Sequence, residues 1–286
     1  DKDPSKVASQ TWFRIAFPDH PYGRPVDGTA KTVGAIGQPD LEDFRARTFA
    51  IDTLRVSVVG DITPAALGPY LDKVFGGLAN TARLRDVPDV ALAVGPRQEI
   101  VAMDVPQSVV QFGNSGLARK DPDFIAASVL NYIIGGGGFG SRLTEEVREK
   151  RGLAYSVYTY LQPLRRAAIY LGGVATKNEA VATSLEVIRA ELTRIGAEGP
   201  TAEELDDAKR YMTGSYALRF DSSPHIAEQL LGIQIEELGI DYVDRRNGLV
   251  DAVGIEDVRR SAKRILRPAG LIITIVGQPE KIGSGG

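Results

Sequence analysis

Apolar positions in the second half of the chain repeat with the periods of both strands and helices. Short β-branched and aromatic runs predict strands at residues 99–105 and 108–114. Residues 153–161 and 167–175 predict a hairpin. Longer periodic segments predict helices at residues 122–134, 141–150, 179–195, 202–220 and 224–237. Because strands and helices are grouped instead of alternating as βαβ units, the pattern favours an α+β fold with helices on one face of a mainly antiparallel sheet.

Two distant stretches share one pattern of apolar and polar positions. Residues 41–61 and 255–278 each predict an amphipathic helix followed by a β-branched strand that ends in Val-Gly. A repeat of this kind indicates two homologous lobes, each a two-layer α/β sandwich. Since far fewer residues precede the helix in the first copy than in the second, the first lobe is expected to be incomplete.

The repeat, and the segment between its copies, predict the domain organisation. Residues 84–97 contain prolines and lack helical periodicity, which is typical of a linker. We therefore expect the C-terminal part of a first lobe at residues 1–82, a linker at 83–97, a complete second lobe at 98–280 and a flexible tail at 281–286.

The composition of the 286 residues excludes several classes of protein. Apolar residues make up 43% of the chain and charged residues 25%, and no apolar run approaches the roughly 18 to 20 residues that cross a membrane. The net charge of −3 gives no electrostatic reason to bind nucleic acid. The absence of cysteine excludes disulfides, thiolate metal sites and a cysteine nucleophile. We expect neither a nucleic-acid partner nor a membrane span.

A loop of consecutive glycines precedes an aromatic residue in the order Gly135, Gly136, Gly137, Gly138 and Phe139. The loop contains G-x-G-x-x-G, but a helix is predicted where a dinucleotide site needs a strand, and Tyr160 stands where that site needs an acid. A phosphate loop also needs Lys-Ser or Lys-Thr after its last glycine, whereas Ser-Arg follows here. Two interpretations remain: a flexible connection between helices, or a place where another backbone approaches closely.

The chain has only two histidines, which cannot supply a histidine-rich metal site. His225 begins the stretch HIAEQ, which matches four positions of the inverted zinc-peptidase motif H-x-x-E-H. Gln229 takes the place of the second histidine, and because an amide is a poor zinc ligand we interpret the match as chance. His20, in a proline-rich turn, is expected to be a hydrogen-bonded loop residue. No metal site is predicted in this chain.

The stretch SRLTEEVREKRGLAYSVYTYL, residues 141–161, resembles the insulinase family of inverted-motif zinc peptidases, which includes the mitochondrial processing peptidase. The segments HPYGRP and VVGD resemble the end of that family's first lobe, and residues 99–278 resemble a complete second lobe. The resemblance implies two homologous lobes that close as a clam shell, with the zinc motif early in the first. It also implies an arginine–tyrosine pair that faces the zinc from the other half.

The family's pair corresponds to Arg148 and Tyr155. A helix end and a strand start that are joined by a turn at Gly152 can aim a guanidinium and a phenol at the same point. Such donors would hold a substrate carbonyl and stabilise the oxyanion that forms when zinc-bound hydroxide attacks it. Taken alone, Arg148 would be a solvated helix charge and Tyr155 a strand residue packed on the core.

The resemblance also gives the glycine loop a function in substrate binding. It implies that an extended peptide approaches the glycines from 135 to 138 and that Phe139 makes an apolar contact with the peptide. The peptide is expected to add to an edge strand of the sheet.

The chain departs from the family because it contains no H-x-x-E-H motif. One explanation is that the chain is the C-terminal portion of a self-sufficient zinc metallopeptidase whose zinc motif lies in the absent front half. The other is that a partner supplies the zinc. Segments within residues 172–223 look closer to the bacterial subunits that lack zinc and are exported.

We therefore favour a periplasmic subunit of a zinc endopeptidase, inactive alone. It would bind the peptide substrate and pair with a homologous zinc-bearing subunit or with a second copy of itself. A further alternative is a structural core subunit such as those of respiratory complexes. The pair of Arg148 and Tyr155 argues against it, since a scaffold has no need of such donors.

Overall fold

The computed structural model describes residues 2–93, 95–280 and 282, and it divides into two compact units. One, the sheet unit, consists of Asp1–Pro25, Pro88–Met212 and Gly248–Gly286. The other, the helical unit, consists of Val26–Val87 and Thr213–Asn247. The chain therefore leaves the sheet unit twice and returns to it twice.

The sheet unit is built around a five-stranded sheet with the order β1-β5-β2-β4-β3. β1 runs parallel to β5, and the other neighbouring strands are antiparallel. The strands are β1 (Arg97–Ala102), β2 (Gln107–Ser115), β3 (Ala154–Pro163), β4 (Ala168–Lys177) and β5 (Ile272–Gly277). The α+β fold with a mainly antiparallel sheet is confirmed, and so are the strands and the hairpin expected between residues 99 and 175.

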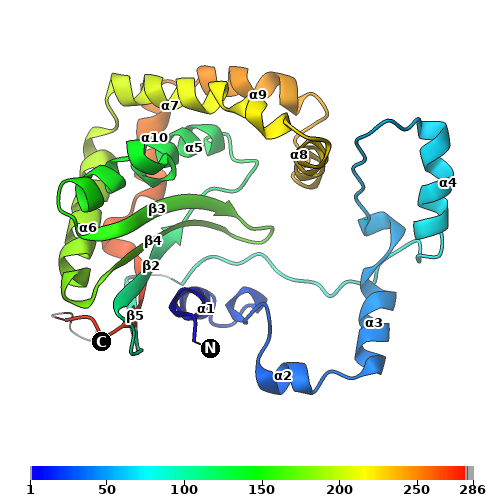
Figure 1. Cartoon of the computed structure of the whole chain (residues 1–286), viewed down its shortest axis with the longest axis horizontal. Coiled ribbons are helices and arrows are strands. Elements are labelled where there is room, and N and C mark those ends of the chain that lie inside the picture. The colour runs from blue at the N-terminus through cyan, green and yellow to red at the C-terminus, as the bar shows by residue number, and fades with distance from the viewer. Residues whose placement is uncertain (1, 94, 281, 283–286) are drawn as a thin grey trace. The chain divides into compact units, whose positions relative to one another are not determined.

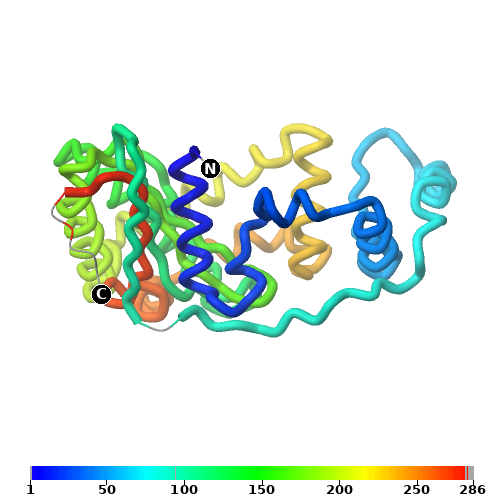
Figure 2. Tube along the Cα trace, turned by 90° about the horizontal axis from the view of Figure 1, so that it is seen from below, coloured from blue at the N-terminus to red at the C-terminus, as the bar shows by residue number. Residues whose placement is uncertain are grey.

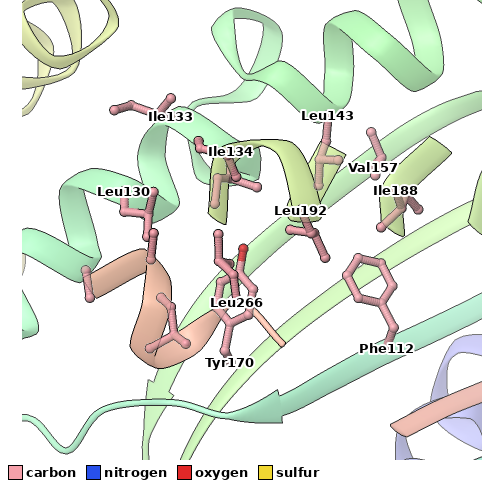
Figure 3. Packing of buried hydrophobic residues seen from close by; sticks show 14 of the residues in the cluster. Phe112, Leu130, Ile133, Ile134, Leu143, Val157, Tyr170, Ile188, Leu192 and Leu266 are labelled. Atoms are coloured by element: carbon pink, nitrogen blue, oxygen red, sulfur yellow. The ribbon is translucent and has the colours of Figure 1, made fainter. Parts of the chain in front are cut away.

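A layer of helices covers one face of the sheet, formed by α5 (Phe124–Asn131), α6 (Val181–Glu198) and α10 (Ile255–Ile265) (Figure 1). Alternate strand residues such as Phe112 and Tyr170 point toward this layer. They meet apolar side chains that include Leu130, Ile134 and Leu192 (Figure 3). All five side chains are almost completely buried, and each large apolar side chain buried in this way contributes roughly 1.5–3 kcal/mol.

The helix α1 (Pro4–Ala16) packs on the opposite face, beside β5 and β2 (Figure 2). Its Trp12 is fully buried, and the indole Nε1 donates to the carbonyl oxygen of Ile272 at 2.9 Å. The ring lies over Gly113, where a Cβ would come within 2.9 Å of it. The sequence predicted helices on one face of the sheet only. This was wrong, because α1 covers the opposite face. β5 is buried at every position, so both faces of the sheet need apolar cover there.

Several helices differ from their predicted ranges because the winding of the backbone changes. α5 gives way to the π turn Tyr132–Gly136, and the helix expected at residues 141–150 is largely the π turn Thr144–Glu149. α7 (Ala202–Gly214) is followed by the 3-10 turn Tyr216–Phe220. α9 (Tyr242–Asp251) has no predicted counterpart, because its polar sequence lacks an apolar stripe. Among the described residues, no helix combines the length and the apolar character that crossing a bilayer requires.

The helical unit contains the helices α2 (Ala30–Gly34), α3 (Gln38–Thr48), α4 (Pro64–Phe75) and α8 (Ser223–Ile235). Leu41 and Phe44 of α3 are more than half exposed. The strand expected at the end of residues 41–61 was wrong, since residues 54–59 belong to no strand in the described part of the chain. A strand needs neighbours for its backbone amides and carbonyls. The matching segment of the second copy, β5, has them in β1 and β2.

The division into units differs from the predicted lobes. The sequence placed residues 1–82 in one lobe, but Asp1–Pro25 pack with the sheet unit. Part of the linker predicted at residues 83–97 is also bonded to that unit, through the amides of Val90 and Ala93. Contacts do not establish which segments are homologous, so the lobe boundaries, including residues 98–280, stay a prediction. The tail expected at residues 281–286 lies, except for Ile282, outside the described residues.

Two aspartates at the start of α5 connect it to α10. Arg264 donates to Asp121 at 2.7 and 2.8 Å and to Asp123 at 2.7 Å, and Arg260 donates to Asp123 at 2.7 and 3.0 Å. The hydrogen bond from Arg260, together with that from Arg264, holds the pKa of Asp123 below its usual range although burial opposes this. The connection is therefore sensitive to acid.

Asp123→Asn should lower the free energy of unfolding at neutral pH by roughly 1–3 kcal/mol, because both arginines lose a charged acceptor. A carboxyl group with a depressed folded-state pKa stabilises the protein above its unfolded pKa of about 4, and that contribution is lost as pH falls through the lower folded value. The variant should therefore lose less stability than the parent on acidification. Denaturant unfolding at several pH values measures this.

The control is Glu256→Gln, which removes the exposed pair with Arg259. It should change stability by less than about 1 kcal/mol. If both substitutions have the same effect, the connection between α5 and α10 does not contribute as described.

Candidate functional site

Arg148 lies near the end of the π turn Thr144–Glu149, in which the backbone is wound more widely than in an α-helix. The helix ends at Gly152, whose φ of 60° is left-handed. The amides of Gly152 and Leu153 donate to the carbonyls of Arg148 and Val147 at 2.8 and 2.9 Å. The bond from Gly152 to Arg148 is that of an αL cap, and the predicted cap at Gly152 is confirmed.

Tyr155 is the extra residue of a β-bulge at the start of β3. Ala154 and Ser156 pair with the consecutive residues Thr176 and Ala175 of β4, so Tyr155 has no partner position. A bulge changes the direction of the side chain that it carries. The side chain of Tyr155 is 77% exposed, so it does not pack on the core.

The structure brings Arg148 and Tyr155 together, and Phe139 joins them. The Cζ atom of Arg148 lies 5.1 Å from the ring centroid of Tyr155 and 4.7 Å from that of Phe139. Phe139 is 75% exposed, and its ring and that of Tyr155 attract the guanidinium through cation–π interactions. Nε of Arg148 lies 3.3 Å from Oε1 of Glu149. The contact that the structure shows is between the guanidinium and the rings, and the catalytic role of the pair stays a prediction.

The glycine loop is shaped by contacts with its own chain. A Cβ at Gly135 would come within 2.7 Å of the backbone nitrogen of Thr159, so the backbone that approaches here is that of β3. A Cβ at Gly136 or Gly137 would meet the preceding helix, whereas Gly138 has a φ of 60° and open space around it. Binding of a peptide by these glycines and Phe139 stays a prediction. Gly135 is buried and offers little surface for it.

The described residues contain no group of three or more His, Cys, Asp or Glu side chains that could hold a metal ion. His20 is buried, with Nε2 3.1 Å from the carbonyl oxygen of Pro88 and Nδ1 accepting from the amide of Tyr22 at 3.2 Å. It is a hydrogen-bonded loop residue, as expected. His225 is exposed, and its hydrogen bond to Asp221 at 2.6 Å raises its pKa. The residues present therefore do not fit the zinc ion that the resemblance implies.

Comparison with known proteins decides the family. The sequence profile of the peptidase M16 inactive domain matches residues 35–212, more than half of the chain. The chain belongs to the peptidase M16 inactive-domain family. The resemblance to the insulinase-type peptidases is thereby confirmed.

Relatives of this M16 chain include proteins named as proteases and as non-peptidases. It is 28% identical over 284 residues to an uncharacterized zinc protease of Streptomyces coelicolor, covering 96% of this chain and 61% of that protein. It is 27% identical over 219 residues to a non-peptidase homolog of Helicobacter pylori, covering 77% of this chain and 50% of that protein. The M16 chain thus spans about three fifths or less of the length of these relatives.

Solved structures share the fold of the M16 chain. The peptidase M16 inactive domain of Pseudomonas fluorescens matches with a TM-score of 0.89 at 28% identity, over 99% of this chain and 67% of that one. A chain of complex III2 from Candida albicans has the same fold, with a TM-score of 0.78 at 16% identity, over 97% of this chain and 68% of that one.

Gly135→Ala should lower the free energy of unfolding by roughly 1–3 kcal/mol, because the new methyl group would collide with the backbone of Thr159. Gly140→Ala is the matched control in the same loop, since a Cβ there has nothing within 4 Å. Its effect should be within about 0.5 kcal/mol. Denaturant unfolding compares the two variants, and equal stabilities would contradict the packing role of Gly135.

Proposed function

We propose that this chain is the non-zinc, substrate-binding subunit of an M16 endopeptidase, in which Arg148 and Tyr155 contact the peptide bond to be cleaved. The observation that carries the proposal is the placing of the Arg148 guanidinium over two highly exposed rings, those of Phe139 and Tyr155. A purely structural subunit would be more stable with such rings buried. Their exposure around a cation therefore favours a binding surface.

The donors of the pair are available to a substrate. Cation–π attraction uses no hydrogen-bond donor, so it orients the guanidinium without occupying its N–H groups. Within the described residues, neither Nη atom of Arg148 nor the hydroxyl of Tyr155 has a hydrogen-bond acceptor. Both groups can donate to a peptide carbonyl oxygen and to the oxyanion that develops from it, and contacts that strengthen in the transition state accelerate the reaction.

β3 is an edge strand of the sheet, to which a peptide can add. β3 is the last strand of the sheet and is paired with β4 on one side. An extended peptide can bond to the amides and carbonyls of the other edge as an additional strand. Tyr155 stands at the start of β3, so a peptide along this edge would pass the pair.

A partner would supply the zinc ion, because the residues described here do not fit one. We propose a homologous zinc-bearing subunit as that partner, with a second copy of this chain as the alternative. The likeness to a non-peptidase homolog supports a subunit without zinc. The likeness to a longer zinc protease supports the other alternative, in which the zinc half belongs to the same polypeptide. Export to the periplasm is part of the proposal.

Zinc content and peptide hydrolysis test whether this protein needs a zinc-bearing partner for cleavage. The full-length protein is assayed alone and together with a zinc-bearing homologue from the same organism. We expect no stoichiometric zinc and no cleavage from the protein alone, and cleavage from the mixture. Stoichiometric zinc together with cleavage by the protein alone would refute the subunit proposal.

Arg148→Lys and Tyr155→Phe should each lower kcat of the active assembly by about 10²–10³, the usual effect of losing one oxyanion donor. Lysine keeps the charge but not the planar fork, and phenylalanine keeps the ring but not the hydroxyl. Arg210→Lys and Tyr70→Phe are matched controls at exposed positions and should leave kcat unchanged. Unchanged kcat in both site variants would remove their catalytic role.

A further inference from the structure

We propose that Arg142 is a positioning residue, which holds the segment that carries Phe139 and Arg148 in the orientation required for peptide binding. The effect on turnover rests on the function proposed above. The effect on the segment itself does not, because it can be measured in the protein alone.

Arg142 is buried, with 7% of its surface exposed, and its guanidinium donates to two carboxylates. Nε and Nη2 donate to the two oxygens of Glu204 at 2.5 and 2.6 Å, and Nη1 donates to Glu191 at 3.2 Å. Glu191 belongs to α6 and Glu204 to α7. A single side chain therefore fastens the start of the segment to two helices, and the bidentate pair fixes direction as well as distance.

Both carboxylates are held by further partners. Glu204 accepts from the amide of Thr201 at 2.7 Å, and Glu191 accepts from Arg194 at 2.8 and 3.0 Å. Burial alone would raise the pKa of Glu204, but the hydrogen bonds from Arg142 and Thr201 lower it, so the group stays charged. The fork of Arg142 thus meets acceptors that are already fixed in place.

Ser141 connects this anchor to the glycine loop. Its hydroxyl donates to the carbonyl oxygen of Gly138 at 2.8 Å, and its amide donates to the same oxygen at 3.1 Å. These bonds close the turn Gly138–Gly140, which carries Phe139. The ring centroid of Phe139 in turn lies 4.7 Å from the Cζ atom of Arg148. The anchored arginine is therefore linked to both residues through short contacts.

Apolar packing also holds the segment, through Leu143 and Val147, which are fully buried. Apolar contacts are not directional, so they fix the depth of a helix more strongly than its rotation. If Arg142 acted only on global stability, its loss would speed exchange throughout the sheet unit to a similar degree. A positioning role predicts a local effect.

Arg142→Lys tests this, because lysine keeps the positive charge beside Glu191 and Glu204 but cannot form the bidentate pair. Hydrogen exchange is measured on the full chain, comparing amides of residues 138–149 with those of β2 and β4. We expect exchange in residues 138–149 to become at least about tenfold faster, with a change of less than about twofold in the strands. Glu204→Gln, which can still cap α7, should have the same local effect.

Arg259→Lys is the matched control. It alters an exposed arginine that pairs with Glu256 on α10 and leaves Arg142, Glu191 and Glu204 in place, so exchange in residues 138–149 should not change. Unchanged exchange in Arg142→Lys, or equal acceleration in the segment and in the strands, would overturn the proposal.

Kinetics of the active assembly separate this proposal from the function on which it rests. Arg142→Lys should lower kcat with little change in KM, since the donors remain but are misaligned. The positioning role would be overturned if Arg142→Lys speeds exchange locally but leaves kcat unchanged, while Arg148→Lys lowers kcat of the same assembly. If Arg148→Lys and Tyr155→Phe have no effect either, the proposed function fails, and the exchange data alone decide whether Arg142 holds the segment.

Discussion

At Gly152 the backbone takes a left-handed conformation, and the amides of Gly152 and Leu153 bond back to the carbonyls of Arg148 and Val147. An L-residue with a side chain rarely adopts this conformation. The reversal ends the helix within one residue and starts β3 almost immediately. Arg148 and Tyr155 can meet only because the chain folds back this sharply. The site therefore depends on a backbone constraint before it depends on any side chain.

Two irregularities on either side of that turn determine where the side chains point. The π turn Thr144–Glu149 sets the direction of Arg148, and the bulge between Ala154 and Ser156 sets that of Tyr155. Irregular windings of both kinds are frequent at functional sites, since they present side chains that a regular helix or strand would bury or misdirect. The buried ion pairs of Arg142 stabilise the first irregularity, and pairing with β4 stabilises the second.

Periodicity along the sequence was sufficient to predict the sheet and most of its helices. Apolar residues recur at every second position along a strand and at every third or fourth position along a helix, so the spacing shows which face is buried. The resemblance to the insulinase family, together with the turn at Gly152, predicted that Arg148 and Tyr155 would meet. The π turn, the bulge and the contact with Phe139 left no such pattern, since each depends on packing between distant segments. The strand expected at residues 54–59 failed for a related reason: the sequence has β propensity, but a strand exists only where a neighbour accepts its hydrogen bonds.

Each place where the chain leaves the sheet unit lies beside the place where it returns. The ring of His20 contacts the carbonyl of Pro88 at 3.1 Å, and Nζ of Lys209 donates to the carbonyl of Val253 at 3.0 Å. Both parts of the helical unit are thus inserts, and a hydrogen bond within the sheet unit joins the two ends of each. Exchange of either insert for a short bridging loop should leave the five-stranded sheet intact, because no strand of that sheet lies within an insert.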